Sequence, residues 1–586
     1  MRPAPLGPRA GMPPEMATPM TIIGLLWGGL GLAGLVWASG AAVAWAGTGR
    51  WRPPKFSLDT AGEVARRGPG EVFGAPTNHL LVTWAVLGVL LSVAAGVWAA
   101  RGTRRAPSDD PLRSLARPAD LPTLIPAGAA RRARDLRPGL EVNPAPEQCG
   151  LALGRLSPDG PLLRSSWEDV AVAIMAPRAG KTTALAVPMV LAAPGAVIAT
   201  SNKADLVTST WALRAQVGQC WVFDPQGIAH TPRRFYFDPL AGVGTVAQAN
   251  RLAQQFSQQV KDPSRVGGDF WTSAAEDLLT ALILAAACDG RDLAEVYSWL
   301  NDSAARLPVQ LLRAHGHPAA AAGLEGRQAG AVETREGIYE TARTAAQVLR
   351  DPDVLAWVTP QPGLPGLDPR TIPGGRDTVY AMSKDGGASA APLVAALVDA
   401  LFVAGQRRAE AAAGRLDPPM LAMLDEAANV AKIPDLPQLY SHLGSRGIPV
   451  VTILQSYRQG AGVWGDNGME TLWGAATIKV VGAGIDDARF AEDLSRLVGE
   501  HDVTVRSATH GRDSSSQLSL RRQRILPPEA IRALPRGRAL LLATGTRAAL
   551  IDLCPWYAGA QAKQISQATK HAEGAISTRA REGVTP

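Results

Sequence analysis

The 586-residue sequence predicts an α/β fold in which a parallel β-sheet is covered by helices on both faces. Seven short apolar runs alternate with helical stretches, and continuous apolar strands are typical of a sheet buried on both faces. These predicted strands lie at 170–175 (VAVAIM), 196–200 (AVIAT), 220–224 (CWVFD), 379–382, 420–424, 450–454 and 478–481. Residues 244–374 break this alternation with helical periodicity throughout, which predicts an inserted all-alpha domain. Two long apolar segments before residue 101 predict two N-terminal transmembrane helices.

The composition excludes several classes of protein. Hydrophobic residues make up 46% of the chain and charged residues 19%, which excludes an intrinsically disordered protein. The four cysteines, Cys149, Cys220, Cys288 and Cys554, lie far apart and form no C-x-x-C pair. This spacing excludes a disulfide scaffold and the usual zinc sites, and it indicates a reducing compartment.

The two predicted spans lie at residues 21–46 and 78–100. The first has 26 residues without a charge, and a helix needs about 20 apolar residues to cross the hydrocarbon core. A cleaved signal peptide is the alternative for the first segment, but its apolar run is too long and a second span follows. We therefore expect a tail at 1–20, two transmembrane helices within 21–100 and a short external loop at 47–77.

The charge distribution indicates the orientation of these spans. Residues 101–137 carry nine arginines and four acidic residues, a net charge of +5. The positive-inside bias places this side in the cytoplasm, so both termini are expected there and the protein is expected to be a multi-pass protein of the cell membrane. The predicted external loop itself carries five basic residues. Residues 101–150, rich in Pro, Arg and Ala, predict a basic juxtamembrane linker.

A phosphate-binding loop follows the first apolar strand. Its residues are Met175, Ala176, Pro177, Arg178, Ala179, Gly180, Lys181, Thr182 and Thr183. They match the Walker A pattern G-x-x-x-x-G-K-[ST] except that Met175 replaces the first glycine. Backbone N–H groups of such a loop bind phosphate oxygens, Lys181 is expected to reach the β- and γ-phosphates of ATP, and the Thr182 hydroxyl is expected to hold Mg²⁺. A side chain at the first position costs about 1–3 kcal/mol if the backbone there is strained.

A second motif ends the apolar strand at 420–424. Asp425 and Glu426 follow it directly, as in a Walker B motif, and buried carboxylates are costly unless they have partners. Asp425 is expected to coordinate Mg²⁺ through water, and Glu426 to orient the attacking water. An ordinary strand end with exposed acids is the alternative. Gln455, at the end of the next apolar strand, suits a γ-phosphate sensor, although a turn residue is equally compatible.

These three motifs in order predict a RecA-like P-loop NTPase domain. It comprises residues 151–243 and 375–556, and the all-alpha domain at 244–374 is inserted between Walker A and Walker B. The remaining residues, 557–586, are polar and small, which predicts a flexible tail.

The chain at this point resembles the coupling proteins of type IV secretion and conjugation, the TraG/TraD family, over about residues 20–556. Besides the spans and Walker A, the segments that carry the resemblance are ATSNKADL at 199–206, VFDP at 222–225, FWTSAAEDLL at 270–279, the segment at 424–456 and LPPEAIRALPRGRALLL at 526–542. The resemblance implies a membrane-anchored, hexameric ATPase that uses ATP and Mg²⁺. It also implies that the protein recruits relaxase-bound single-stranded DNA and drives its transfer to a type IV secretion channel during conjugation.

The chain departs from this family at two places. One is Met175, and the other is the segment LGSRGI at 443–448, where many members have G-R-S-R-G-I. The missing arginine resembles an arginine finger that acts across a subunit interface. Arg446 is the candidate to replace it, at an offset of two residues, so hydrolysis is expected to be weak if this replacement fails.

The net charge of +7 does not by itself identify a DNA-binding surface. The all-alpha insertion has a net charge of −4, and the largest positive share follows the second span. One cluster around a Ser-rich loop is a candidate for DNA-backbone contacts, with a solvated hairpin as the favoured alternative. It consists of Arg506, Arg512, Arg521, Arg522 and Arg524.

Two other functions stay open from the sequence. An FtsK/HerA-like motor for DNA or protein export shares the three motifs, but the long helical insertion before Walker B disfavours it. A weakly hydrolysing platform that recruits substrate is favoured by Met175 and by the missing arginine.

Overall fold

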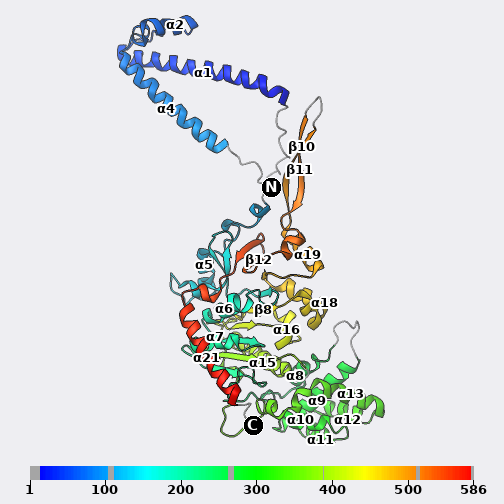
Figure 1. The fold of residues 1–586 in the computed structure, drawn as a ribbon. Coiled ribbons are helices and arrows are strands. Elements are labelled where there is room, and N and C mark those ends of the chain that lie inside the picture. Colours follow the sequence, from blue (N-terminus) through cyan, green and yellow to red (C-terminus); the bar gives the residue numbers. More distant parts are fainter. Residues whose placement is uncertain (1–13, 103–110, 262–269, 387–388, 510–514, 583–586) are drawn as a thin grey trace. The chain divides into compact units, whose positions relative to one another are not determined.

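The computed structural model describes residues 14–102, 111–261, 270–386, 389–509 and 515–582 (Figure 1). The chain divides into two compact units, residues 1–108 and residues 109–586.

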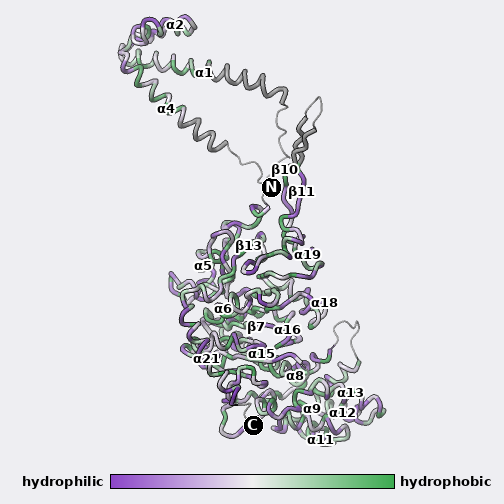
Figure 2. Tube along the Cα trace, in the orientation of Figure 1, coloured by the Kyte–Doolittle hydropathy of each residue, from purple (hydrophilic) through white to green (hydrophobic). Residues whose placement is uncertain are grey.

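The first unit is a pair of long apolar helices joined by two short ones. Its elements are α1 (Pro14–Thr48), α2 (Leu58–Arg67), α3 (Pro69–Phe73) and α4 (Thr77–Gly102). The two predicted spans fall within α1 and α4, whose described parts are largely hydrophobic (Figure 2). Trp84 of α4 donates a hydrogen bond from Nε1 to the carbonyl of Val36 in α1 at 3.1 Å, and Leu80 is buried between them.

The same two helices expose many apolar side chains. Leu30, Leu35, Val89 and Leu90 are each about half exposed or more. Exposed aliphatic side chains on a long helix suit hydrocarbon rather than water, so α1 and α4 are candidate membrane spans. The predicted external loop at 47–77 is not extended, because it folds into α2 and α3.

The second unit is built on an 11-stranded sheet in the order β2-β1-β13-β12-β9-β3-β8-β7-β4-β6-β5. Seven neighbouring strands are parallel, and they are the seven apolar runs predicted as strands. Their bounds are β3 (Ala171–Ile174), β4 (Val197–Ser201), β5 (Cys220–Phe223), β6 (Thr378–Met382), β7 (Leu421–Leu424), β8 (Val450–Leu454) and β9 (Ile478–Val481). The predicted α/β fold class with a parallel sheet is confirmed.

Four antiparallel strands extend this sheet beyond β9, and the sequence did not predict them. They are β1 (Leu151–Leu156), β2 (Leu162–Ser165), β12 (Arg538–Ala543) and β13 (Ala549–Asp552). β1 pairs with both β2 and β13, so the start and the end of the α/β region lie side by side. β1 and β2 are interrupted by Arg155 and Arg164, which hides them from a search for continuous apolar runs. β12 and β13 do contain apolar runs, at 539–543 and 549–551, which were not predicted as strands.

Helices cover both faces of the sheet, and two apolar cores result. Along β3, Val172 and Ile174 point into one core, whereas Ala171 and Ala173 point into the other. The helices α6 (Val187–Ala192) and α7 (Asp205–Arg214) pack on the second face, and α16 (Ala427–Val430), α18 (Tyr457–Ala475) and α19 (Ala488–Val498) lie on the first (Figure 1). Alternate residues of a strand face opposite sides, which produces this division.

The inserted region forms a helical domain. Its longer elements are α8 (Val246–Ser257), α9 (Phe270–Cys288), α10 (Leu293–Leu300), α11 (Leu307–Ala314), α12 (Pro318–Gln328), α13 (Val332–Ala345) and α14 (Pro352–Ala356). α9 is long and apolar enough to cross a membrane, but most of it is buried among the other helices, so it is the core helix of this domain. Arg251 of α8 pairs with Asp399 of α15 (Ala391–Ala411) at 2.6 and 2.7 Å, which ties the insertion to the sheet.

The predicted juxtamembrane linker at 101–150 is wrong from residue 111 onward. This part folds onto the sheet, with α5 (Pro126–Leu136) and three 3₁₀ turns, η1 (Pro111–Ser114), η2 (Pro118–Asp120) and η3 (Pro146–Cys149). Leu121 and Ala133 are completely buried. Apolar residues at helical spacing among the arginines, rather than the overall composition, decided this packing. Residues 103–110 lie outside the described residues.

The predicted flexible tail at 557–586 is also wrong for most of its length. α21 (Ala562–Glu582) packs along α7, with Ile565 buried and Ile576 partly buried against the same core. Thr569 Oγ1 lies 3.4 Å from Ser209 Oγ of α7. Two isoleucines on one helical face are enough to bind this polar helix to an existing apolar surface.

The arginine cluster around the Ser-rich loop lies on a β-hairpin, as the favoured alternative predicted. β10 (Glu500–Thr509) and β11 (Ser515–Arg524) form a separate two-stranded sheet. Arg524 pairs with Glu492 of α19 at 2.5 and 2.7 Å, whereas Arg521 and Arg522 are exposed. Arg512 and the side chain of Arg506 lie outside the described residues.

Candidate nucleotide-binding site

The phosphate-binding loop begins where β3 ends, at the carboxyl edge of the parallel sheet. Met175 continues the strand, because its N–H donates to the carbonyl of Leu454 at 3.0 Å, and its side chain is completely buried. Its φ is not in the left-handed region, so the strain expected from a missing glycine does not arise. The side chain instead fills space beside Gly482, where a Cβ would lie 2.6 Å from Met175 Cγ. Met175 is therefore a core residue.

The loop turns sharply before the helix begins. Arg178 and Gly180 adopt left-handed conformations, with φ of 63° and 95°, and the N–H of Ala179 donates to the carbonyl of Ala176 at 3.2 Å. Pro177 and Arg178 are exposed at the tip. The following helix starts at Lys181 with a π-helical turn, η4 (Thr182–Ala186), and continues as α6. This arrangement of a tight turn and a helix N-terminus is one that binds anions through backbone N–H groups.

Three neighbouring strands bring the predicted site residues together. β3, β8 and β7 lie side by side and end at the same edge, so the loop, Gln455 and the acidic pair meet there. Lys181 Nζ forms an ion pair with Glu426 Oε1, and both side chains are buried. Gln455 Nε2 donates to the other carboxylate oxygen of Glu426 at 2.7 Å, and Thr182 Oγ1 donates to Asp425 Oδ2 at 3.0 Å. The alternative interpretation, an ordinary strand end with exposed acidic residues, is therefore excluded.

The Asp425 carboxyl group has the environment of a cation ligand. Burial raises the pKa of Asp425 to about 6, against which the positive charge of Lys181 acts. Its Oδ1 atom is buried and accepts no hydrogen bond from the described residues. An unpaired buried carboxylate oxygen is unfavourable, and Mg²⁺ prefers carboxylate and hydroxyl oxygens. The oxygen atoms of Asp425 and Thr182 therefore fit a bound Mg²⁺ ion.

Glu426 is held in a sparsely populated backbone conformation. Its φ of 55° and ψ of 40° are left-handed, which costs about 1–3 kcal/mol in a residue with a side chain. The strand beneath it is fixed by Thr200 of β4, whose Oγ1 donates to the carbonyl of Asp425 at 3.0 Å. This geometry directs the Glu426 carboxylate between Lys181 and Gln455.

Two residues of this network were missed in the sequence. Thr200 is a hydroxyl residue in the apolar strand AVIAT, and that break in the pattern was its only signal. Gln459 accepts from the N–H of Gln455 at 2.9 Å and donates to Asn429 at 2.8 Å, which connects the sensor to the short helix α16 after β7. Gln459 belongs to α18, and its position one helical turn after Gln455 carried no distinguishing signal.

The structure does not bring Arg446 to this site. Arg446 precedes β8, so it lies at the amino edge of the sheet, whereas Gln455 follows the same strand at the carboxyl edge. Its guanidinium lies 3.6 Å from Glu410 of α15 and is partly exposed. Any role of Arg446 in hydrolysis therefore has to be exerted on another subunit.

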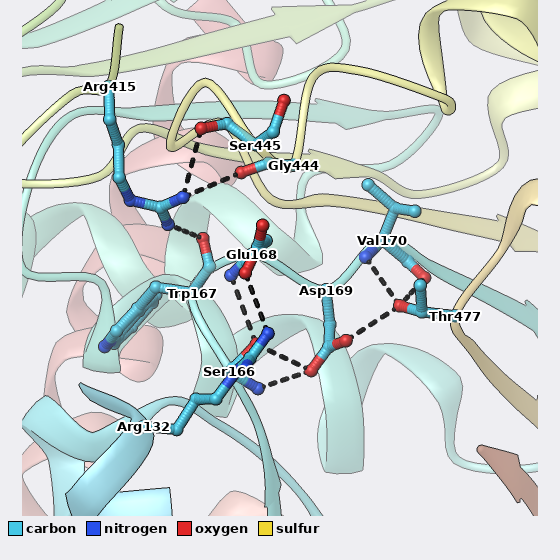
Figure 3. A network of polar contacts seen from close by, with 10 residues as sticks. All are labelled: Arg132, Ser166, Trp167, Glu168, Asp169, Val170, Arg415, Gly444, Ser445 and Thr477. Atoms are coloured by element: carbon cyan, nitrogen blue, oxygen red, sulfur yellow. Dashed lines mark hydrogen bonds and ion pairs between the residues drawn. The ribbon is translucent and has the colours of Figure 1, made fainter. Parts of the chain in front are cut away.

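The segment that carries Arg446 is anchored by another arginine (Figure 3). Arg415 donates from Nη1 to the carbonyls of Gly444 at 3.2 Å and Ser445 at 3.1 Å, and from Nη2 to the carbonyl of Trp167 at 2.7 Å. Desolvation by burial lowers the pKa of Arg415, and the negative charges of Glu168 and Asp417 oppose this shift. The LGSRGI segment is therefore a fixed part of the amino edge.

Comparison with protein families identifies one matching region. Residues 419–536, from β7 to beyond α20 (Pro528–Arg532), match the family described as the TraM recognition site of TraD and TraG. This region contains Asp425, Glu426 and Gln455. No curated protein matches the chain. The predicted resemblance to the TraG/TraD family is confirmed by the family match and by the fold.

The solved structures with a similar fold include several of one conjugative coupling protein. The unbound form of TrwBdeltaN70 is 17% identical, covers 72% of this chain and 91% of its own, and has a TM-score of 0.52. The form in complex with sulphate is 19% identical, covers 69% and 89%, and has a TM-score of 0.51. TrwB in complex with ADP and Mg²⁺ is 18% identical, covers 69% and 90%, and has a TM-score of 0.50. At these identities the likeness establishes a shared fold.

Proposed function

We propose that this chain, which resembles the TraG/TraD coupling proteins, is a membrane-anchored ATPase of the type IV coupling protein kind. Its substrate is then relaxase-bound single-stranded DNA, which it delivers to a type IV secretion channel during conjugation. The observation that carries the ATPase assignment is the convergence of Lys181, Thr182, Asp425, Glu426 and Gln455 at the ends of three adjacent parallel strands. The family match over 419–536 supports the role in conjugation.

Nucleotide binding uses the loop and the acidic pair. The backbone N–H groups of the loop and the ammonium group of Lys181 bind the β- and γ-phosphates of ATP. Thr182 and Asp425 hold Mg²⁺, which neutralises developing charge on the phosphates when it is bound. TrwB has been solved with a non-hydrolysable ATP analogue and with ADP and Mg²⁺, which supports both cofactors for this chain.

Hydrolysis requires the Lys181–Glu426 ion pair to separate. When Lys181 turns to phosphate oxygens, the Glu426 carboxylate becomes free to orient the attacking water. Gln455, which donates to Glu426 at 2.7 Å, is placed to exchange that contact for one to the γ-phosphate. The left-handed backbone of Glu426 keeps its carboxylate in place while these partners change.

The position of Arg446 supports a ring in which subunits complete one another's sites. Within one chain, Arg446 and Gln455 lie at opposite edges of the sheet. In a head-to-tail homo-hexamer, the amino edge of one subunit can face the nucleotide of the next. We assign Arg446 as an arginine finger that acts on the neighbouring subunit, where such a residue stabilises the transition-state charge.

The apolar helices α1 and α4 anchor this motor in the cell membrane with two spans and both termini in the cytoplasm. Their exposed aliphatic side chains and the arginines that follow α4 support this topology. The helical domain at 244–374 has a net negative charge and lies outside the sheet, so we assign it to recognition of the relaxase rather than of DNA.

The test is ATP turnover by the full chain in neutral-lipid nanodiscs, with and without single-stranded DNA. Lys181→Ala and Glu426→Gln are expected to lower turnover by about 100-fold or more, because each removes a transition-state contact. In cells, deletion of the gene is expected to abolish conjugative DNA transfer.

Two other outcomes would replace the proposal. Absence of turnover in the wild-type protein together with loss of DNA transfer would identify a recruitment platform, which the missing family arginine in the segment at 443–448 favours as the second candidate. Turnover with undiminished DNA transfer after deletion would identify an FtsK/HerA-like exporter.

A further inference from the structure

The lysines of this chain are few and unevenly placed. Only nine of the 59 basic residues are lysine, at positions 55, 181, 203, 261, 384, 432, 479, 563 and 570. Four of the nine follow parallel strands at the carboxyl edge: Lys181 after β3, Lys203 after β4, Lys384 after β6 and Lys432 after β7. Lys181 belongs to the nucleotide site, and the other three have no role there.

Strand register places two of these lysines at the same level of the sheet. Ser201 at the end of β4 is paired with Met382 at the end of β6, and Lys203 and Lys384 each follow two residues later. Neighbouring strands lie about 4.8 Å apart, so the two loops begin side by side. β4 also pairs with the Walker B strand β7, which puts Lys203 next to the nucleotide site.

The backbone of both lysines is fixed although their side chains are exposed. The N–H of Lys203 donates to Ser201 Oγ at 3.2 Å, and the N–H of Lys384 donates to Gln226 Oε1 at 2.8 Å. Gln226, from the loop after β5, also accepts from Ser383 Oγ at 3.1 Å. Both ammonium groups are thereby presented to solvent from anchored loops.

Each of these loops also carries an exposed carboxyl group, Asp205 two residues after Lys203 and Asp385 directly after Lys384. In the part of the chain that the structure describes, neither Lys203 nor Lys384 forms an ion pair. Lys432 differs, because it is half-buried and its charge acts on Asp385. Burial raises the pKa of Asp385, and the positive charge of Lys432 opposes this shift. Among the described residues, Lys203 and Lys384 are therefore the lysines that this end of the edge presents to solvent without an ion pair.

The chemistry of lysine indicates the ligand. An ammonium group is a point charge with rotatable donors and no preferred fork geometry, whereas arginine holds phosphate in a fixed bidentate contact. Two neighbouring ammonium groups without a fixed binding geometry can bind successive phosphates of a polymer and release them as the polymer moves. The triphosphate of ATP is already bound by the loop and Lys181, which leaves a nucleic-acid backbone.

We infer that Lys203 and Lys384 contact the phosphate backbone of the single-stranded DNA that the motor moves, an assignment that rests on the proposed function. The nucleotide site reaches this contact through Thr200, which donates to the carbonyl of Asp425 and lies three residues before Lys203. A shift of Asp425 between nucleotide states is thus passed along β4 to Lys203.

The experiment compares two double variants of the full chain in neutral-lipid nanodiscs. Lys203→Gln with Lys384→Gln removes the two proposed contacts, and Lys563→Gln with Lys570→Gln removes the same charge from exposed positions on α21. Binding of fluorescently labelled oligo-dT is measured by anisotropy as a function of salt concentration, and thermal unfolding midpoints verify that both variants are folded.

The first variant is expected to bind oligo-dT about tenfold more weakly at moderate salt, with the log–log salt slope reduced by about 1.4, because each lost single-strand phosphate contact contributes about 0.7. The α21 variant is expected to keep the wild-type affinity and slope. If both variants bind alike, the assignment of Lys203 and Lys384 is wrong while the proposed function stands. If the wild-type chain hydrolyses ATP but binds no oligo-dT, the DNA substrate itself is wrong.

Discussion

Replacing Asp425 by Asn separates what this residue does for stability from what it does for function. The folded protein keeps the Asp425 carboxyl group buried, with one oxygen bonded to Thr182 and the other unpaired among the described residues. Asn has the same shape and its oxygen can still accept from Thr182, but it carries no charge. We expect Asp425→Asn to be more stable than the wild-type protein without nucleotide and inactive with it.

The magnitude follows from the raised pKa. Burial moves the pKa of Asp425 from 3.8 to about 6, so the ionised form is disfavoured in the folded state. The contribution of Asp425 to the free energy of unfolding is fully present below about pH 4 and is lost as the pH rises through about 6. The difference between these two pKa values, at 1.36 kcal/mol per pKa unit, makes the ionised carboxylate cost about 3 kcal/mol at neutral pH. Asn avoids that cost, but its amide N–H groups replace the unpaired Oδ1 atom and themselves cost about 1–3 kcal/mol, so the expected net gain is about 1 kcal/mol.

The assay is the thermal unfolding midpoint of the full chain in nanodiscs, followed from about pH 5 to about pH 8. The variant's midpoint should exceed that of the wild type near neutral pH, and the difference should shrink toward pH 5. ATP with Mg²⁺ should raise the wild-type midpoint but not that of the variant. Asp466→Asn, at an exposed position, is the control and should change neither. A variant less stable than the wild type at neutral pH would refute the reasoning.

Three further substitutions test the site. Met175→Gly should lower the unfolding midpoint, because removing a buried Met side chain costs about 2–5 kcal/mol, and faster ATP turnover without destabilisation would contradict the assignment of Met175 to the core. Gln455→Ala should lower kcat about 100-fold while ADP affinity, measured by calorimetry, stays within a few-fold, and an unchanged kcat would remove Gln455 from the mechanism. Arg446→Ala should leave ATP affinity unchanged and lower the kcat of the assembled ring about 1000-fold. Mixing this variant with Lys181→Ala subunits, which keep Arg446, should restore part of the turnover. An absence of such rescue would argue against action between subunits.

Those elements of the fold were predictable whose residue pattern lies within a short stretch of the sequence. The seven parallel strands are mostly apolar, because a strand covered on both faces has few positions for polar side chains, and Lys479 in β9 is the charged exception. The antiparallel strands β1 and β2 are interrupted by arginines, and the pairing of β1 with β13 joins residues near 155 with residues near 552. The helix α21 and the segment from residue 111 to 150 were assigned by composition, which does not register a few apolar residues spaced along one helical face.

The residues of the candidate site could be predicted from the sequence, because strand, turn and phosphate-binding helix are consecutive in the chain and fix their own geometry. The partners of these residues depend on tertiary packing. Lys181 pairs with Glu426, 245 residues away, and Met175 proves to be a core residue because Gly482 leaves room for it. The edge on which each residue lies depends on strand direction, so the loops of Lys203 and Lys384 begin beside the nucleotide site while Arg446 lies at the opposite edge. Such neighbours are set by the order of strands in the sheet, which no local pattern encodes.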